Sequence, residues 1–224
     1  MTQQVQLILD ELKALSSEKA ARIYQKVVVS ESVLGVNKGP LRKLAQTYLP
    51  NHELGLALWE TKVYEARIMA TMIIEPKKLT IEDLDRLISE SNSVFVIDEL
   101  CFDVFESFAA NIELFQRWVK HPDLMHQRVA YNAAIVEVHR KRVTLVQAEA
   151  LLDRIEAELC DSEELVKYAM NRCMVEIAIN YPDLTQRVLT KSEQMGVYKE
   201  MKVAKGCTSP YAPDWIHAIL RRKT

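Results

Sequence analysis

Apolar residues recur every three or four positions along almost the whole chain, which is the spacing that places side chains on one face of an α-helix. Proline or glycine then interrupts each stripe, as at Pro40, Pro76 and Gly196. The pattern predicts about eleven or twelve helices and no convincing strand. The first stripe consists of Val5, Ile8, Leu9, Leu12 and Leu15.

Local signals support these helix boundaries and suggest how the helices are arranged. Thr80 with Asp83, and Thr144 with Gln147, have the spacing of capping boxes. Two other helix starts, "PDLMHQRV" and "PDLTQRVL", resemble each other. Helix pairs joined by short turns, together with these two similar helix starts, predict an all-α solenoid of degenerate repeats. We expect it to form a single domain over residues 1–224. A compact helical bundle is the alternative.

Composition is that of a soluble globular chain, with 49% hydrophobic and 27% charged residues. The net charge of −2 argues mildly against a dedicated nucleic-acid binder, although it leaves room for a local basic face. The N-terminus reads as an amphipathic helix and not as a signal peptide. No stretch has the length of a membrane span. Four cysteines without a CxxC pair are typical of reduced thiols, so we expect a cytoplasmic protein.

Several kinds of chemistry lack their usual patterns. The five histidines form no HxxxH or HExxH spacing, so we predict no metal site. A glycine-rich phosphate loop is also missing, which argues against nucleotide hydrolysis, and no cofactor is expected. The three tryptophans lie at helical core spacing and are interpreted as packing residues; they are Trp59, Trp118 and Trp215.

Charged residues inside apolar runs raise a different question. Asp98 lies in "SVFVIDEL", where an unpaired carboxylate would be costly. It is either a carboxylate in a functional cleft or a helix-surface acid paired with a basic group such as Arg128. Glu65 and Arg67 in "VYEARIMA" allow two interpretations as well, an acid–base site or a structural ion pair between repeats.

Two groups of basic residues are candidates for phosphate contacts. Lys38, Arg42 and Lys43 surround Pro40 near a predicted helix N-terminus, where exposed amides and cations favour anions. They also fit a solvated helix face. The run "HRKR" at residues 139–142 ends another helix, so it either contacts phosphates or complements the helix dipole.

Three sequence motifs together resemble those of one known protein family. "LGVNKGPLRKLAQ", "LALWETKVYEARIMAT" and "VIDEL" resemble the DNA alkylation repair family of HEAT-like repeat proteins, which includes the AlkD-like glycosylases. The resemblance extends from about Leu34 to Asn180. It implies a right-handed solenoid of HEAT-like repeats with a concave, basic DNA-binding face. Active members of that family excise alkylated purines, such as N3- and N7-methyl bases, without a metal.

The match is uneven at individual residues. Asp98 falls on the family's catalytic aspartate, and Arg128 on a basic residue that contacts the DNA backbone. Val94 and Arg172, however, stand where active members carry the aromatic walls of the lesion cleft. A carboxylate can stabilise the sugar cation of N-glycosidic cleavage, but without those walls it loses the positioning of the lesion. The chain is therefore more similar to an AlkF-type branch, which lacks detectable base excision.

The leading hypothesis is a DNA-binding protein of this family that recognises duplex, damaged or branched DNA. One alternative is an active alkylpurine DNA glycosylase in which Asp98 stabilises the sugar cation, so enzymatic activity stays open. A protein-binding helical scaffold is the further alternative. The candidate DNA contacts are Lys38, Arg42, Lys43, Arg128, Arg140, Arg142, Lys167 and Arg172.

Overall fold

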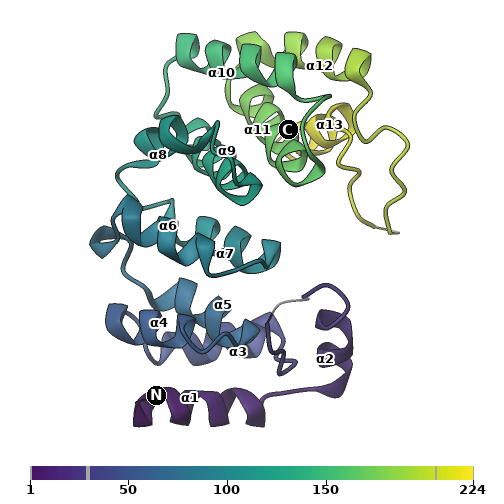
Figure 1. Cartoon of the computed structure of the whole chain (residues 1–224). Helices are drawn as coiled ribbons and strands as arrows, with labels where there is room; N and C mark the ends of the chain where they lie inside the picture. Colours follow the sequence, from purple (N-terminus) through teal and green to yellow (C-terminus); the bar gives the residue numbers. More distant parts are fainter. Residues whose placement is uncertain (1, 29–30, 205, 224) are drawn as a thin grey trace. The chain divides into compact units, whose positions relative to one another are not determined.

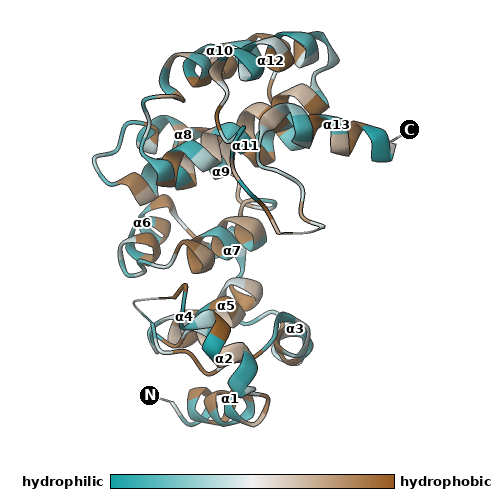
Figure 2. Cartoon of the chain, turned by 90° about the vertical axis from the view of Figure 1, so that its right-hand side faces the viewer, coloured by the Kyte–Doolittle hydropathy of each residue, from teal (hydrophilic) through white to brown (hydrophobic). Residues whose placement is uncertain are grey.

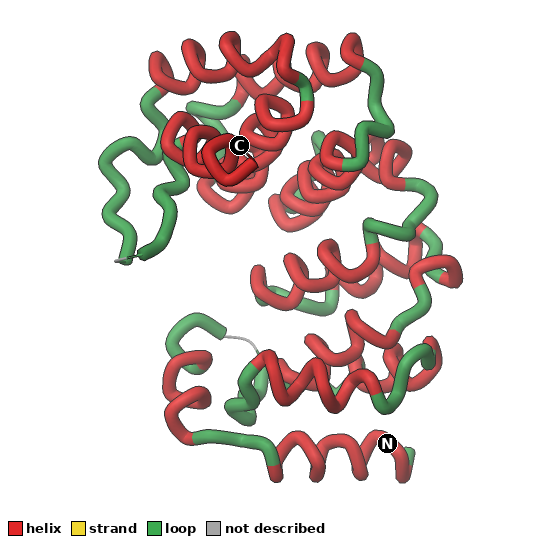
Figure 3. Tube along the Cα trace, turned by 180° about the vertical axis from the view of Figure 1, so that it is seen from behind, coloured by secondary structure: helices red, strands yellow, loops and turns green. Residues whose placement is uncertain are grey.

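A computed structural model of the chain describes residues 2–28, 31–204 and 206–223. Within these ranges, thirteen α-helices and one short 3-10 helix follow one another, and no strand is formed. Figure 3 shows helices joined by loops throughout this part of the chain. An isolated bridge between Ser32 and Val63 is the one β-type pairing among the described residues. The prediction of an all-helical chain is therefore confirmed.

The helices form two compact units (Figure 1), Met1–Ala110 and Asn111–Thr224. The prediction that one repeat domain spans residues 1–224 stays a prediction. Unit 1 contains α1 (Gln3–Ala14), α2 (Glu18–Tyr24), α3 (Lys38–Gln46), α4 (His52–Trp59), α5 (Tyr64–Ile73), η1 (Pro76–Lys78), α6 (Ile81–Ser89) and α7 (Val94–Val104). Unit 2 contains α8 (Asn111–Trp118), α9 (Leu124–His139), α10 (Leu145–Glu158), α11 (Glu164–Asn180), α12 (Pro182–Met195) and α13 (Ala212–Lys223).

Helix α5 is the centre of unit 1, where it packs against α3, α4 and α7. Its apolar residues are buried on several sides, and so are the polar side chains of Glu65, Arg67 and Thr71. Burying polar groups is costly unless each finds a hydrogen-bond partner. The packing of unit 1 therefore depends on where these three side chains make their bonds.

Glu65 holds the loop that leads into α3. Its carboxylate accepts hydrogen bonds from three consecutive backbone amides, those of Leu34 at 2.9 Å, Gly35 at 2.6 Å and Val36 at 3.2 Å. Gly35 adopts a φ of 92°, which is open to glycine but disfavoured for other residues. A Cβ atom there would also lie 2.6 Å from the carbonyl oxygen of Ser17, so the loop approaches α2 closely. Successive amides in such a turn form a natural anion site, which Glu65 fills from within the chain.

Arg67 makes a second buried connection. Its Nη1 atom donates to the Glu31 carboxylate at 2.7 Å, and its Nε atom donates to the Trp59 carbonyl at 3.0 Å. Its guanidinium lies 5.0 Å from the centre of the Trp59 ring. Ser91 donates to the same Glu31 oxygen at 2.7 Å. Glu65 and Arg67 thus bind separate partners, and each has a structural role in unit 1.

In unit 2, α9 and α11 pack against each other along their length, with α8 on α9 and with α12 and α13 on α11. Their contact surfaces are apolar, from Val129 on α9 to Ile177 on α11. Figure 2 shows hydrophilic and hydrophobic residues interspersed along the outer helices α10 and α12. No helix in the described ranges combines the length and the apolar composition needed to cross a bilayer.

Candidate nucleic-acid interface

Helix α3 presents the first group of predicted DNA contacts. Lys38 and Arg42 lie one turn apart on this helix, Lys43 follows, and all three residues are exposed. Lys38 forms an ion pair with Glu99 of α7. Arg42 and Lys43 form no ion pair with any residue that the structure describes. Two cations at the surface of unit 1 are thus available for phosphate.

Asp98 lies on the solvent side of α7, within unit 1. Phe95 precedes it by three residues and Phe102 follows it by four, so the three side chains share one face of the helix. Both rings are exposed, Phe95 at 47% and Phe102 at 67%. Two exposed rings on one helix face beside a carboxylate are a candidate site of interaction. We call Phe95, Asp98 and Phe102 the α7 patch.

Asp103, one turn beyond Glu99 on α7, is a partly buried carboxylate. Burial raises the pKa of its carboxyl above the usual range, and the hydrogen bond that Thr71 donates at 2.6 Å lowers it in part. The negative charge of Glu99 raises this pKa further, whereas the positive charges of Arg42 and Lys38 lower it. The α3 cations therefore act on acids of α7 as well as facing solvent.

Arg128 on α9 is largely buried in unit 2, and its predicted contact with the DNA backbone stays a prediction. The residue is only 5% exposed, and its Nη1 atom donates to the carbonyl oxygen of Leu165 at 2.7 Å. Its guanidinium lies 5.6 Å from the centre of the Tyr168 ring on α11, within cation–π range. Arg128 thus supports an aromatic side chain at the surface.

Tyr168 belongs to a group of three aromatic residues from separate segments of unit 2. Its ring centre lies 6.2 Å from that of Tyr198, in the loop after α12, and 6.3 Å from that of Trp215 on α13. The Tyr198 hydroxyl donates to Glu164 at 2.7 Å. Burial, followed by this hydrogen bond, raises the pKa of Tyr198 far above its ordinary value, so the hydroxyl stays protonated.

Two predicted cations lie near Tyr168 along α11. Arg172 is exposed and lies one turn beyond Tyr168, and Lys167 is half-buried beside it. In the described part of the chain, neither residue forms an ion pair. We call Lys167, Tyr168, Arg172, Tyr198 and Trp215 the α11 patch.

The end of α9 carries the remaining predicted contacts. Arg140 caps the helix and is exposed. Arg142 donates to the buried Glu137 carboxylate at 3.1 Å, and His139 lies 3.3 Å from Glu176. Two members of the "HRKR" run are thus held by acids of unit 2.

Sequence reasoning missed the aromatic members of both patches. Phe95 and Phe102 were detectable, because their spacing from Asp98 already places them on its helix face. Tyr168 was detectable in part, since it lies one turn before Arg172. No local pattern in the sequence predicts that Tyr198 and Trp215 lie near Tyr168. Their positions depend on how the loop after α12 and helix α13 pack against α11. The structure divides the predicted contacts between the units, with Lys38, Arg42, Lys43 and Asp98 in unit 1 and the rest in unit 2.

Exposed aromatic rings next to cations have a clear chemical capacity. An aromatic ring can stack on the face of an unpaired base, and a neighbouring cation can bind the adjoining phosphate. The α11 patch has both types of group, and unit 1 has the α7 rings together with the cations of α3. This combination is typical of surfaces that bind nucleic acid with little dependence on sequence.

A comparison with solved structures supports the predicted fold. One solved structure superimposes with a TM-score of 0.84 and 22% sequence identity, over 98% of this chain and 94% of the other. It is described as "A new family of proteins related to the HEAT-like repeat DNA glycosylases with affinity for branched DNA structures". The chain therefore has a HEAT-like repeat fold, as the sequence predicts.

Two relatives come from Listeria. The uncharacterized proteins Lin0241 of Listeria innocua serovar 6a and Lmo0209 of Listeria monocytogenes serovar 1/2a are each 22% identical over 216 residues, which is 93% of this chain and 92% of each relative. The family model of "DNA alkylation repair enzyme" matches residues 8–216. That match spans nearly the whole sequence, and the chain therefore belongs to the DNA alkylation repair enzyme family.

Proposed function

We propose that the protein binds damaged or branched DNA, without excising bases, through the concave basic face expected of HEAT-like repeats. The observation that carries the proposal is the α11 patch, in which the exposed Tyr168 ring contacts the buried Arg128 and lies one helical turn from the exposed Arg172. Such a ring suits a base that has lost its stacking partner. Bases of this kind occur at branch points and lesions and are rare in intact duplex.

The cations of α3 and α11 supply the second part of the proposal. Arg42, Lys43 and Arg172 are exposed and form no ion pair within the described residues, so they can release counterions from DNA on binding. Arg128 contributes indirectly, by holding Tyr168 from below. The solved relative with affinity for branched DNA supports the same type of ligand.

Val94 and Arg172 support the absence of base excision. These positions carry the cleft aromatics in active glycosylases of the resembling family, and here one side chain is aliphatic and the other is a cation. A cationic lesion would be repelled by Arg172, not held by it. Asp98 on its own keeps a stabilising charge but has little to position the sugar.

A titration with labelled DNA of several shapes tests the proposal. Fluorescence anisotropy should show tighter binding to a four-way junction than to a duplex of equal length and charge. Binding should weaken steeply between about 50 and about 200 mM salt, because cation–phosphate contacts displace counterions. Absence of binding below micromolar protein at low salt, or equal affinity for both shapes, would contradict the proposal.

The α7 patch favours a second candidate, an alkylpurine DNA glycosylase. Phe95 and Phe102 place two exposed rings on the face that carries Asp98, and rings there can replace the missing cleft walls. If so, the wild type should release N3- and N7-methylpurines from alkylated DNA, and Asp98→Asn should release them at least about a hundredfold more slowly. Equal release by both proteins would remove Asp98 from catalysis.

A further inference from the structure

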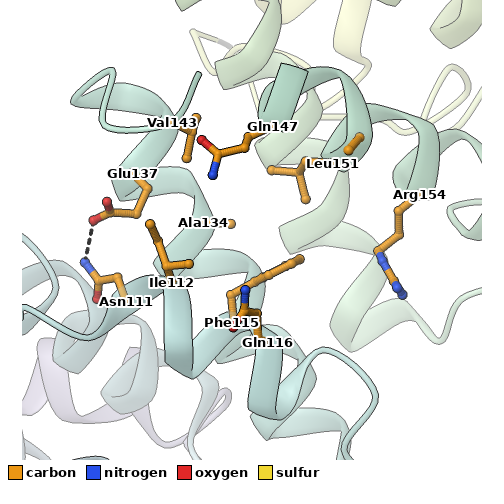
Figure 4. Close-up of a pocket in the computed structure, with 11 residues that line it drawn as sticks. Asn111, Ile112, Phe115, Gln116, Ala134, Glu137, Val143, Gln147, Leu151 and Arg154 are labelled. Carbon is orange, nitrogen blue, oxygen red and sulfur yellow. Dashed lines mark hydrogen bonds between the residues drawn. The ribbon is translucent and has the colours of Figure 1, made fainter. Parts of the chain in front are cut away.

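Unit 2 contains a pocket of about 370 Å³ between α8, α9 and α10, apart from the α11 patch. Its walls include the apolar side chains of Ile112, Phe115, Val143 and Leu151. Figure 4 shows Asn111 and Glu137 on one side of the pocket and Arg154 on the opposite side. This size and lining, apolar walls with a few polar groups, match those of small-molecule sites.

Glu137 gives the pocket a buried hydrogen-bond acceptor. The residue is 6% exposed, and its Oε1 atom accepts from Asn111 Nδ2 at 2.9 Å and from Arg142 Nη1 at 3.1 Å. Its second oxygen, Oε2, accepts no hydrogen bond from any residue in the described ranges. That oxygen is an acceptor position that a bound molecule can fill, because a carboxylate oxygen offers two lone pairs.

Gln147 adds a hydrogen-bond donor to the same lining. Its Oε1 atom accepts from the backbone amide of Thr144 at 2.8 Å, in the capping box of α10. That bond fixes which end of the side-chain amide is oxygen, so the Nε2 end is left free of the cap. Nε2 donates to no described residue.

We propose that this pocket binds a small uncharged molecule with an apolar body, aromatic or aliphatic, and a primary carboxamide. The apolar body would pack against Phe115 and Leu151. The amide N–H would donate to Glu137 Oε2, and the amide oxygen would accept from Gln147 Nε2. The proposal is independent of DNA binding.

Charge in and around the pocket favours a neutral ligand. Arg142 already pairs with Glu137, so a cationic ligand would meet a carboxylate that is largely neutralised and a guanidinium that repels it. An anionic ligand would gain little from Arg142, because that guanidinium is already paired with Glu137. Arg154, on the far side, is paired with Glu158 at 3.0 Å and offers no unpaired cation.

Three probes of nearly equal shape separate these cases, namely benzamide, benzylamine and benzoate. Titration of the full chain, followed by protein NMR, should give saturable shifts with benzamide at a Kd on the order of 1 mM, as expected for so small a ligand. Benzylamine and benzoate should bind at least about tenfold more weakly. Failure of benzamide to saturate by about 10 mM, or tighter binding of either charged probe, would overturn the proposal.

Two matched substitutions on α10 test whether benzamide binds in this pocket. Ala150 lines the pocket from its exposed edge, so Ala150→Trp should fill it without disturbing the core and should weaken benzamide binding at least about tenfold. Ala157 is exposed on the same helix and is not part of the lining, so Ala157→Trp should leave the Kd unchanged. Equal effects of the two substitutions would show that benzamide binds elsewhere and would refute the assignment.

Discussion

Arg172→Glu is expected to weaken binding to a four-way junction by on the order of tenfold at low salt, and to reduce the salt dependence by about one unit of slope. Arg172 is exposed beside Tyr168 and forms no ion pair within the described residues, so its reversal replaces an attraction for phosphate with a repulsion. The helix should be unaffected, because glutamate is a good helix former. Anisotropy titrations at several salt concentrations measure both quantities.

Arg22→Glu is the matched control for this experiment. Arg22 is also an exposed arginine on a helix, but it pairs with Glu18 on α2, in unit 1 and outside both patches. Arg22→Glu changes the net charge by the same amount, but it should alter the affinity for DNA by no more than about twofold. Its effect comes only from the long-range electrostatic field of the protein. A similar loss in the two variants would mean that net charge, and not the α11 patch, governs the interaction.

Glu65→Ala is expected to reduce the free energy of unfolding of the chain by about 3–5 kcal/mol. The substitution removes a fully buried carboxylate and leaves the amides of Leu34, Gly35 and Val36 without their acceptor. Gly35 and Val36 are buried, so water does not readily replace the lost bonds. Urea unfolding, followed by circular dichroism, measures the loss as a shift of the midpoint.

Glu53→Ala provides the reference for that measurement. Glu53 is exposed in the first turn of α4, near the positive end of the helix dipole, and it forms no ion pair within the described residues. Its removal should cost no more than about 1 kcal/mol. Comparable losses in the two variants would show that the amides bound by Glu65 are satisfied in another way after the substitution.

Local patterns predicted the features of this fold that depend on neighbours in the chain. Apolar spacing located the helices, and the Thr80 and Thr144 capping boxes form as expected. Trp59 and Trp118 are fully buried, in agreement with their helical core spacing. These features need only three to seven residues of sequence, so one sequence is sufficient to predict them.

Features that depend on distant segments could not be predicted in the same way. The partners of Glu65 lie about thirty residues earlier in the chain, and no periodicity connects them. Arg128 on α9 lies beneath Tyr168 on α11, and no pattern in either helix connects the two residues. Trp215 is only half-buried, because its ring lies near Tyr168 at the surface. Each of these placements is decided by packing between helices, which a single sequence does not reveal.

The buried oxygen of Glu31 that binds both Arg67 and Ser91 affects how the first unit opens. Repeat arrays are held mostly by contacts between adjacent helices, so their ends usually fray one helix at a time. Here a single acid joins segments 36 and 60 residues away along the chain. Loss of the Glu31 carboxylate would release α5 and the segment that precedes α7 together. We therefore expect these two segments to open together and not one after the other.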